Sequence, residues 1–265
     1  MEHKGEENIR RQEYLKEEEV KDGKLWREGH IFTNEHPVMF PFGPPIYLDK
    51  MSEDVIRELD VLIEQLNGKP EFDASGQLAG RIKKQTHLHQ HISNTAQEEI
   101  VAHCNRMFRM VQEAPATQMP NYNSLSMQIT SIWSNIQEAR EYNPPHAHSG
   151  DFSFVIYCRN DLEKYSLHQL QNNEYDSPHG GTVEGAEQMQ NFPLAGLIEL
   201  QYGEPSWMNW TQFRHVPNRG DIIIFPSWLR HTVYAHYEQS CVRISVAGNV
   251  NILNVNSDDG RQKHT

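Results

Sequence analysis

The sequence predicts an α+β chain, in which two helices precede a sandwich or barrel of short strands. The segments 52–68 and 95–114 have apolar residues at three- and four-residue spacing, as amphipathic helices do. From residue 124 onward, alternating or β-branched runs are separated by turn residues, which is typical of strands. Helices followed by a succession of strands indicate this fold class.

The first helix is expected to begin after Ser52, a residue type that caps helices, and to end at Asn67 and Gly68. The second is expected to begin near Thr95 and to end before Pro115. A short strand is predicted at 46–48, next to a proline-rich stretch. The apolar positions of the first helix are Val55, Ile56, Leu59, Leu62, Ile63 and Leu66.

Later segments have the composition of strands. They are 124–135, 152–158, 196–202, 220–226 and 240–252. Residues 159–195 are rich in Gln, Asn, Gly and Glu and are predicted to form a long insertion, of the kind that is usually a lid or disordered. The predicted organisation is a charged, mobile region at 1–29, a single domain at 30–254 and a tail at 255–265. Within the domain we expect a helical part at 50–115 and a β core at 125–254.

The composition excludes several classes of function. With 24 basic and 36 acidic side chains, the formal net charge is −12, so neither nucleic acid nor an anionic membrane is the expected partner. We find no apolar stretch of membrane-spanning length and no signal peptide, so we expect a soluble, cytoplasmic protein. Cys104, Cys158 and Cys241 lie far apart and are expected to be reduced.

Histidine is abundant, with 15 residues in an otherwise acidic chain, and imidazole is a common ligand of transition metals. His146 and His148 are two residues apart just before the apolar run 152–158. On a strand, side chains at this spacing point the same way, so both can reach one metal ion. A distant third histidine, His231, follows an apolar strand and a Pro-Ser-Trp corner.

Arg243 and Ser245 follow His231 at a distance of about a dozen residues, one strand period apart in an otherwise apolar run. An unpaired guanidinium in an apolar interior is costly, so an anion is expected to meet it. Two or three imidazoles on one side of a metal leave positions for O2 and a bidentate cosubstrate. The arginine fork and the hydroxyl can then hold a distal carboxylate.

These motifs resemble those of the 2-oxoglutarate/Fe(II)-dependent dioxygenases, in particular a bacterial and phage branch with YNPPHxHxG and FPSWLxH…RxS segments. Here the motifs occupy 142–150 and 220–245, and the similarity covers roughly 132–251. The resemblance implies a double-stranded β-helix, a cupin-like jelly roll, with N-terminal helices packed on it. It also implies that His146 and His231 bind Fe(II), that Arg243, helped by Ser245, binds the C5 carboxylate of 2-oxoglutarate, and that O2 is consumed.

The chain departs from the wider superfamily at one ligand, because His148 stands where an aspartate or glutamate is usual. Three interpretations are open: His148 is the third ligand, Asp151 reaches the metal across the intervening turn, or water completes the coordination sphere. Strand geometry favours His148, because an odd offset from His146 points away unless the strand is broken.

Other polar residues are candidates for binding the cosubstrate or a metal, on fewer observations. Asn135 and Tyr142 can hydrogen-bond the cosubstrate carboxylates or simply pack the barrel, and packing is also the expected role of Tyr157. The alternating histidines of 87–91 have the spacing of ligands on a strand. No carboxylate or cysteine accompanies His87, His89 and His91, so a partly exposed strand or loop is favoured.

Three functions of different classes remain open. A dioxygenase of the resembled family would release succinate and CO2 and hydroxylate a C–H of a protein side chain or a small molecule. A cupin-like three-histidine dioxygenase would use no 2-oxoglutarate, and Arg243 and Ser245 would then lack a purpose. A jelly-roll interaction protein would bind no iron.

Overall fold

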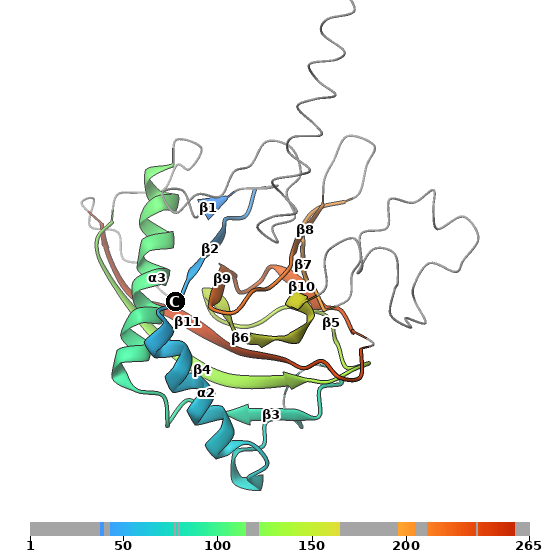
Figure 1. The fold of residues 1–265 in the computed structure, drawn as a ribbon. Helices are drawn as coiled ribbons and strands as arrows, with labels where there is room; N and C mark the ends of the chain where they lie inside the picture. Colours follow the sequence, from blue (N-terminus) through green and yellow to red (C-terminus); the bar gives the residue numbers. More distant parts are fainter. Residues whose placement is uncertain are drawn as a thin grey trace, which may run out of the picture.

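In the computed structural model, two antiparallel β-sheets face each other and two helices cover the outer side of the larger sheet (Figure 1). The structure describes residues 38–39, 43–76, 78, 80–114, 122–164, 196–204, 211–236 and 238–257. The predicted N-terminal region at 1–29, most of the predicted insertion and most of the predicted tail lie outside these residues. The expected α+β double-stranded β-helix is confirmed.

The larger sheet has the strand order β1-β2-β9-β6-β11-β4-β3, and the smaller sheet has the order β5-β10-β7-β8. The strands of the larger sheet are β1 (Val38–Met39), β2 (Ile46–Lys50), β3 (Lys84–His87), β4 (Tyr122–Gln137), β6 (Phe152–Asn160), β9 (Asp221–Pro226) and β11 (Arg243–Ser257). Those of the smaller sheet are β5 (Asn143–His146), β7 (Ile198–Gln201), β8 (Gln212–His215) and β10 (Arg230–Val233).

The alternation of side chains along each strand of the larger sheet divides the core into two layers. On β9, Ile222 and Ile224 join the cluster that contacts the helices, whereas Ile223 and Phe225 join the cluster between the sheets. The side chains of β11 alternate in the same way, and Val246 packs in the cluster that contacts the helices. Arg243 and Ser245 therefore face the space between the sheets.

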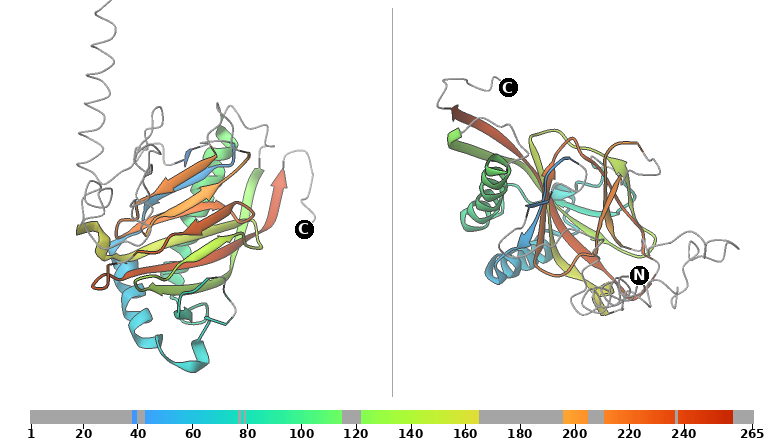
Figure 2. Two further views of the ribbon diagram at one scale, coloured as in Figure 1. Left: turned by 90° about the vertical axis from the view of Figure 1, so that its right-hand side faces the viewer. Right: turned by 90° about the horizontal axis from the view of Figure 1, so that it is seen from above.

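The two predicted helices are confirmed as α2 (Glu53–Leu66) and α3 (Asn94–Glu113). Each begins with a serine cap: Ser52 Oγ accepts from the amide of Val55, and Ser93 Oγ accepts from the amide of Ala96. Their apolar faces pack on the outer side of the larger sheet, while the smaller sheet lies on its other side (Figure 2). The helices therefore leave the space between the sheets free for a site.

Three details differ from the predictions. β3 ends at His87, so the histidines of 87–91 do not alternate along one strand: the chain turns after residue 88. The first residues of the predicted insertion belong to β6 and to the 3-10 turn η2 (Asp161–Lys164). β11 runs to Ser257 in its pairing with β4, so the strand includes the start of the predicted tail. Among the described residues, no helix has the length and apolarity to cross a membrane.

Candidate metal centre and cosubstrate pocket

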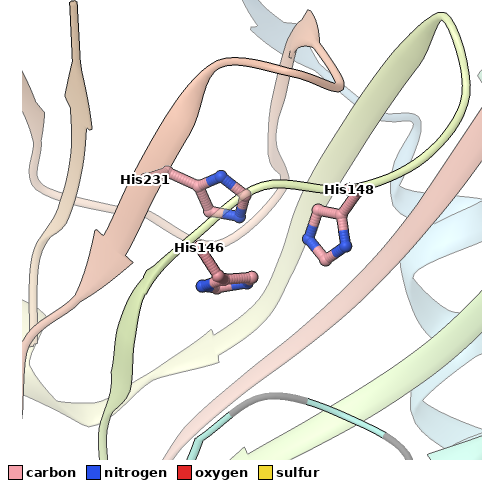
Figure 3. A group of neighbouring side chains, drawn as sticks. All are labelled: His146, His148 and His231. Atoms are coloured by element: carbon pink, nitrogen blue, oxygen red, sulfur yellow. The ribbon is translucent and has the colours of Figure 1, made fainter.

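His146 and His231 are brought together by the pairing of β5 with β10. They are direct Cα partners in this antiparallel pair, and their ring centroids lie 4.3 Å apart. Directly opposed residues in antiparallel strands present their side chains on the same side of the sheet. Residues that are distant in sequence therefore share one point inside the barrel (Figure 3).

His148 joins them from a loop rather than from a strand. β5 ends at His146, so His148 does not lie on the same strand as predicted. The loop after β5 brings its side chain to the other two histidines. The amide of His148 donates to the carbonyl of Ser227 at 2.8 Å, which ties this loop to the corner after β9. Its ring lies 4.9 Å from that of His146 and 5.0 Å from that of His231. One ligand atom from each of the three side chains lies within 4.8 Å of the other two.

Backbone carbonyls select the tautomer of two of these rings. His146 Nδ1 lies 2.7 Å from the carbonyl of Pro144, and His231 Nδ1 lies 3.1 Å from the carbonyl of Leu229. A carbonyl can only accept, so each Nδ1 carries the proton and donates it. The lone pair of each Nε2 is then available for a metal ion.

Burial keeps the three imidazoles neutral. It lowers the pKa of His231 to about 3 and that of His148 to about 4, and it lowers the pKa of His146 as well. The proximity of His146 lowers the pKa of the other two further. Since only a neutral imidazole can ligate a metal, protonation does not compete with binding near neutral pH.

Asp151, the alternative third ligand, lies outside this cluster of ligand atoms. Its carboxylate accepts from the amide of Ile252 at 2.8 Å, and its own carbonyl accepts from the amide of Ser227. These bonds hold the same loop that carries His148. The structure thus gives Asp151 a part in shaping the loop, not a place beside the three histidines.

The histidines His87, His89 and His91 do not form a second cluster among the described residues. His89 and His91 are exposed, and the His91 ring packs against Phe72 at 4.8 Å. The segment that carries these histidines is a partly exposed turn after β3.

Arg243 lies buried in the cavity between the sheets, with 2% of its surface exposed. Its Nη1 donates to the carbonyl of Gly196 at 2.5 Å, but its Nε has no partner. No carboxylate among the described residues pairs with it, and burial lowers its pKa. A buried guanidinium with an unused donor is the property expected of an anion-binding group.

Three further polar residues line the cavity beside Arg243. Asn135, Ser245 and Tyr157 are Cα partners across β4, β11 and β6. The Tyr157 hydroxyl is buried without a hydrogen-bond partner, and its ring lies 5.9 Å from the Arg243 guanidinium carbon. The expectation that Tyr157 only packs the barrel was incomplete. Tyr157 lies two residues after Val155 on β6, and both side chains line the cavity. This even spacing could have indicated the position of Tyr157 from the sequence.

Tyr142, in contrast, is not part of the cavity lining. It precedes β5, and 36% of its surface is exposed. Only its backbone takes part locally, because its carbonyl accepts from the amide of Arg81. The structure therefore does not bring the Tyr142 side chain to the cavity where the cosubstrate was expected, since Tyr142 lies one residue before β5.

A double-stranded β-helix that gathers three neutral histidines and a buried arginine with an unpaired Nε in one cavity defines a candidate metalloenzyme. Residues 131–249 match the model of the family described as Putative 2OG-Fe(II) oxygenase. This part of the chain is thus similar to the 2OG-Fe(II) oxygenases, a family of enzymes that use Fe(II), 2-oxoglutarate and O2. The resemblance found in the sequence is thereby confirmed.

One solved structure supports this fold, and a second is reported for comparison. The non-haem, alpha-ketoglutarate-dependent epimerase SnoN from nogalamycin biosynthesis is 10% identical, with a TM-score of 0.50 over 80% of each chain. An oxidoreductase of the 2OG-Fe(II) oxygenase family from Burkholderia pseudomallei is 12% identical, with a TM-score of 0.46 over 78% of this chain and 84% of that chain. At such identities the likeness to SnoN concerns the fold alone. No curated protein matches the chain.

Proposed function

We propose that His146, His148 and His231 hold Fe(II), and that Arg243 with Ser245 binds the C5 carboxylate of 2-oxoglutarate. The reaction that we propose is hydroxylation of a C–H bond in a protein side chain or a small molecule. The observation that carries the proposal is that one cavity contains both the histidine cluster and a buried guanidinium with an unpaired Nε.

The residues that line the cavity fit both Fe(II) and 2-oxoglutarate. Three neutral imidazoles on one side of a metal leave coordination positions for other ligands. The cavity lining within the described chain contains no aspartate or glutamate, so a dianion meets no repulsion from a carboxylate there. Because the three histidines bring no charge, the negative charge that offsets the metal must come from the bound cosubstrate.

When bound, Fe(II) and 2-oxoglutarate supply the oxidation, in which O2 is consumed and succinate and CO2 are released. The chain's own residues place and protect the reactants. The arginine fixes the far end of the cosubstrate through charge-assisted hydrogen bonds. The carbonyls of Pro144 and Leu229 hold the ligand rings in one tautomer. Burial of the cavity limits water around the metal.

An anaerobic titration with Fe(II), followed by 2-oxoglutarate, tests the proposal. The expected result is iron binding and then a weak visible charge-transfer band on addition of 2-oxoglutarate. Iron binding without the band would favour a three-histidine dioxygenase that uses no 2-oxoglutarate. Failure to bind iron would favour an interaction protein. Turnover is tested by succinate release that depends on added substrate, and hydroxylation by the gain of one oxygen atom in the product, seen by mass spectrometry.

A further inference from the structure

Four buried polar side chains form one row across the larger sheet. Gln85 on β3 is the Cα partner of Asn135 on β4, which pairs with Ser245 on β11, which in turn pairs with Tyr157 on β6. All four line the cavity that contains the histidines and Arg243. Their exposed fractions are 3%, 5%, 4% and 0%, so the row is closed to bulk water.

Gln85 is the unexpected member of this row. It lies outside the segment 131–249 that matches the family model, on the edge strand of the sheet. Its Nε2 donates to Asn135 Oδ1 at 2.6 Å in a fully buried hydrogen bond. Burying an amide is costly unless it is hydrogen-bonded, so the two amides depend on each other for their place in the cavity.

The direction of this bond determines what Asn135 can offer a ligand. An asparagine side chain has one acceptor oxygen and one nitrogen with two donor hydrogens. Because Gln85 occupies the oxygen, the Nδ2 group of Asn135 is left to donate elsewhere. An asparagine without this partner could turn its oxygen toward an anion, which would be repulsive.

We propose that Gln85 is a positioning residue that orients the amide of Asn135, so that Nδ2 donates to a carboxylate of 2-oxoglutarate. This inference rests on the proposed function, because it requires 2-oxoglutarate in the cavity. With Gln85 in place, the row and Arg243 together present the donors of Asn135, Ser245, Tyr157 and the guanidinium. A dicarboxylate is the class of ligand that such a set of donors favours.

A double-mutant cycle tests whether Gln85 acts through Asn135. The variants are Gln85→Met, Asn135→Ala and the combination of both, made in the full chain loaded with Fe(II) without O2. Calorimetry measures the Kd of 2-oxoglutarate and, separately, the Kd of Fe(II). Thr86→Val is the matched control, since Thr86 is equally buried on β3 but is not part of the cavity lining.

Each single variant is expected to raise the Kd of 2-oxoglutarate about tenfold, which corresponds to the loss of about one buried hydrogen bond. The double variant should bind no more weakly than the weaker single variant, because the same interaction is lost. The Kd of Fe(II) should stay within about twofold of the wild-type value, and Thr86→Val should leave both constants unchanged. If Gln85→Met does not fold, Gln85→Ala replaces it in the same cycle.

An unchanged Kd of 2-oxoglutarate in the Gln85 variant would overturn the inference while leaving the proposed function intact. Additive effects of the two substitutions would also overturn it, because Gln85 would then act independently of Asn135. If the wild-type protein binds Fe(II) but not 2-oxoglutarate, the proposed function fails, and the role of Gln85 fails with it.

Discussion

His146 and His231 are direct partners in the pairing of β5 with β10, and each donates from Nδ1 to a carbonyl two residues earlier in its own chain segment. The same local geometry therefore occurs on both strands, which leaves the lone pair of each Nε2 available for a metal ion. His148 approaches the same space from the loop after β5. The pair is thus preorganised by backbone contacts, and only the third histidine depends on a loop.

His231→Ala should abolish iron-dependent turnover of 2-oxoglutarate, because it removes one ligand of the proposed pair. Iron affinity should fall by more than the 10- to 100-fold loss that is typical when a partner of a metal ligand is removed. Anaerobic Fe(II) titration and a succinate assay measure the two effects. His89→Ala, a substitution at an exposed histidine outside the cluster, should change neither. Wild-type activity in His231→Ala would contradict the iron assignment.

Arg243→Met should weaken the binding of 2-oxoglutarate and leave that of Fe(II) nearly unchanged. Loss of hydrogen bonds to a charged group costs about 1.5–3 kcal/mol, so the Kd should rise about 10- to 150-fold. In thermal unfolding, 2-oxoglutarate at 100 times its Kd should stabilise the wild-type protein by about 2.7 kcal/mol and the variant far less. Arg57→Met, at an exposed position of α2, serves as control. Equal stabilisation of both proteins would count against the carboxylate-binding role.

Asp151→Asn should retain iron binding, whereas Asp151→Ala should reduce it. The asparagine keeps an oxygen that can accept from the amide of Ile252, while alanine leaves that amide unpaired. The loop that carries His148 would then loosen, and we expect iron affinity to fall by up to about tenfold, as for other groups that support a ligand. Fe(II) titration of both variants measures this. A large loss in Asp151→Asn would instead support direct ligation by the carboxylate.

The metal-free protein should lose stability as the pH falls below about 6.5. Burial lowers the pKa of His231 from 6.5 to about 3 in the folded chain, so between these values the unfolded chain binds more protons at this residue. The free energy of unfolding therefore decreases with falling pH, and at pH 5 His231 accounts for about 2 kcal/mol. Urea unfolding at pH 7 and pH 5 tests this, with His231→Gln as the comparison. An equal decline in both proteins would contradict the contribution of His231.

Local patterns were sufficient for the elements of the fold. The spacing of apolar residues predicted α2 and α3 nearly to their ends, with Ser52 as the predicted cap of α2, because an amphipathic helix is determined mainly by neighbouring residues. β6, β9 and β11 were predicted from β-branched and aromatic runs for the same reason. The motifs around His146, His231 and Arg243 likewise indicated the class of chemistry.

Predictions that relied on strand spacing alone were less successful. His148 was placed on a strand with His146, but β5 ends first, and hydrogen bonds to Ser227 in the corner after β9 hold the loop. Tyr142 was expected in the cavity and is exposed, while Tyr157 was expected to pack and has a free hydroxyl beside Arg243. Where a strand begins or ends depends on its partners, and these are distant in sequence.

The sequence by itself determined the helices, the main strands and the residue types that can bind a metal and a dicarboxylate. Only the tertiary structure decided which histidines meet among the described residues, that the Asp151 carboxylate bonds the amide of Ile252, and that Gln85 from the N-terminal half joins the polar row. The physical reason is the register between strands: it sets which distant side chains lie opposite one another, and no local pattern encodes it.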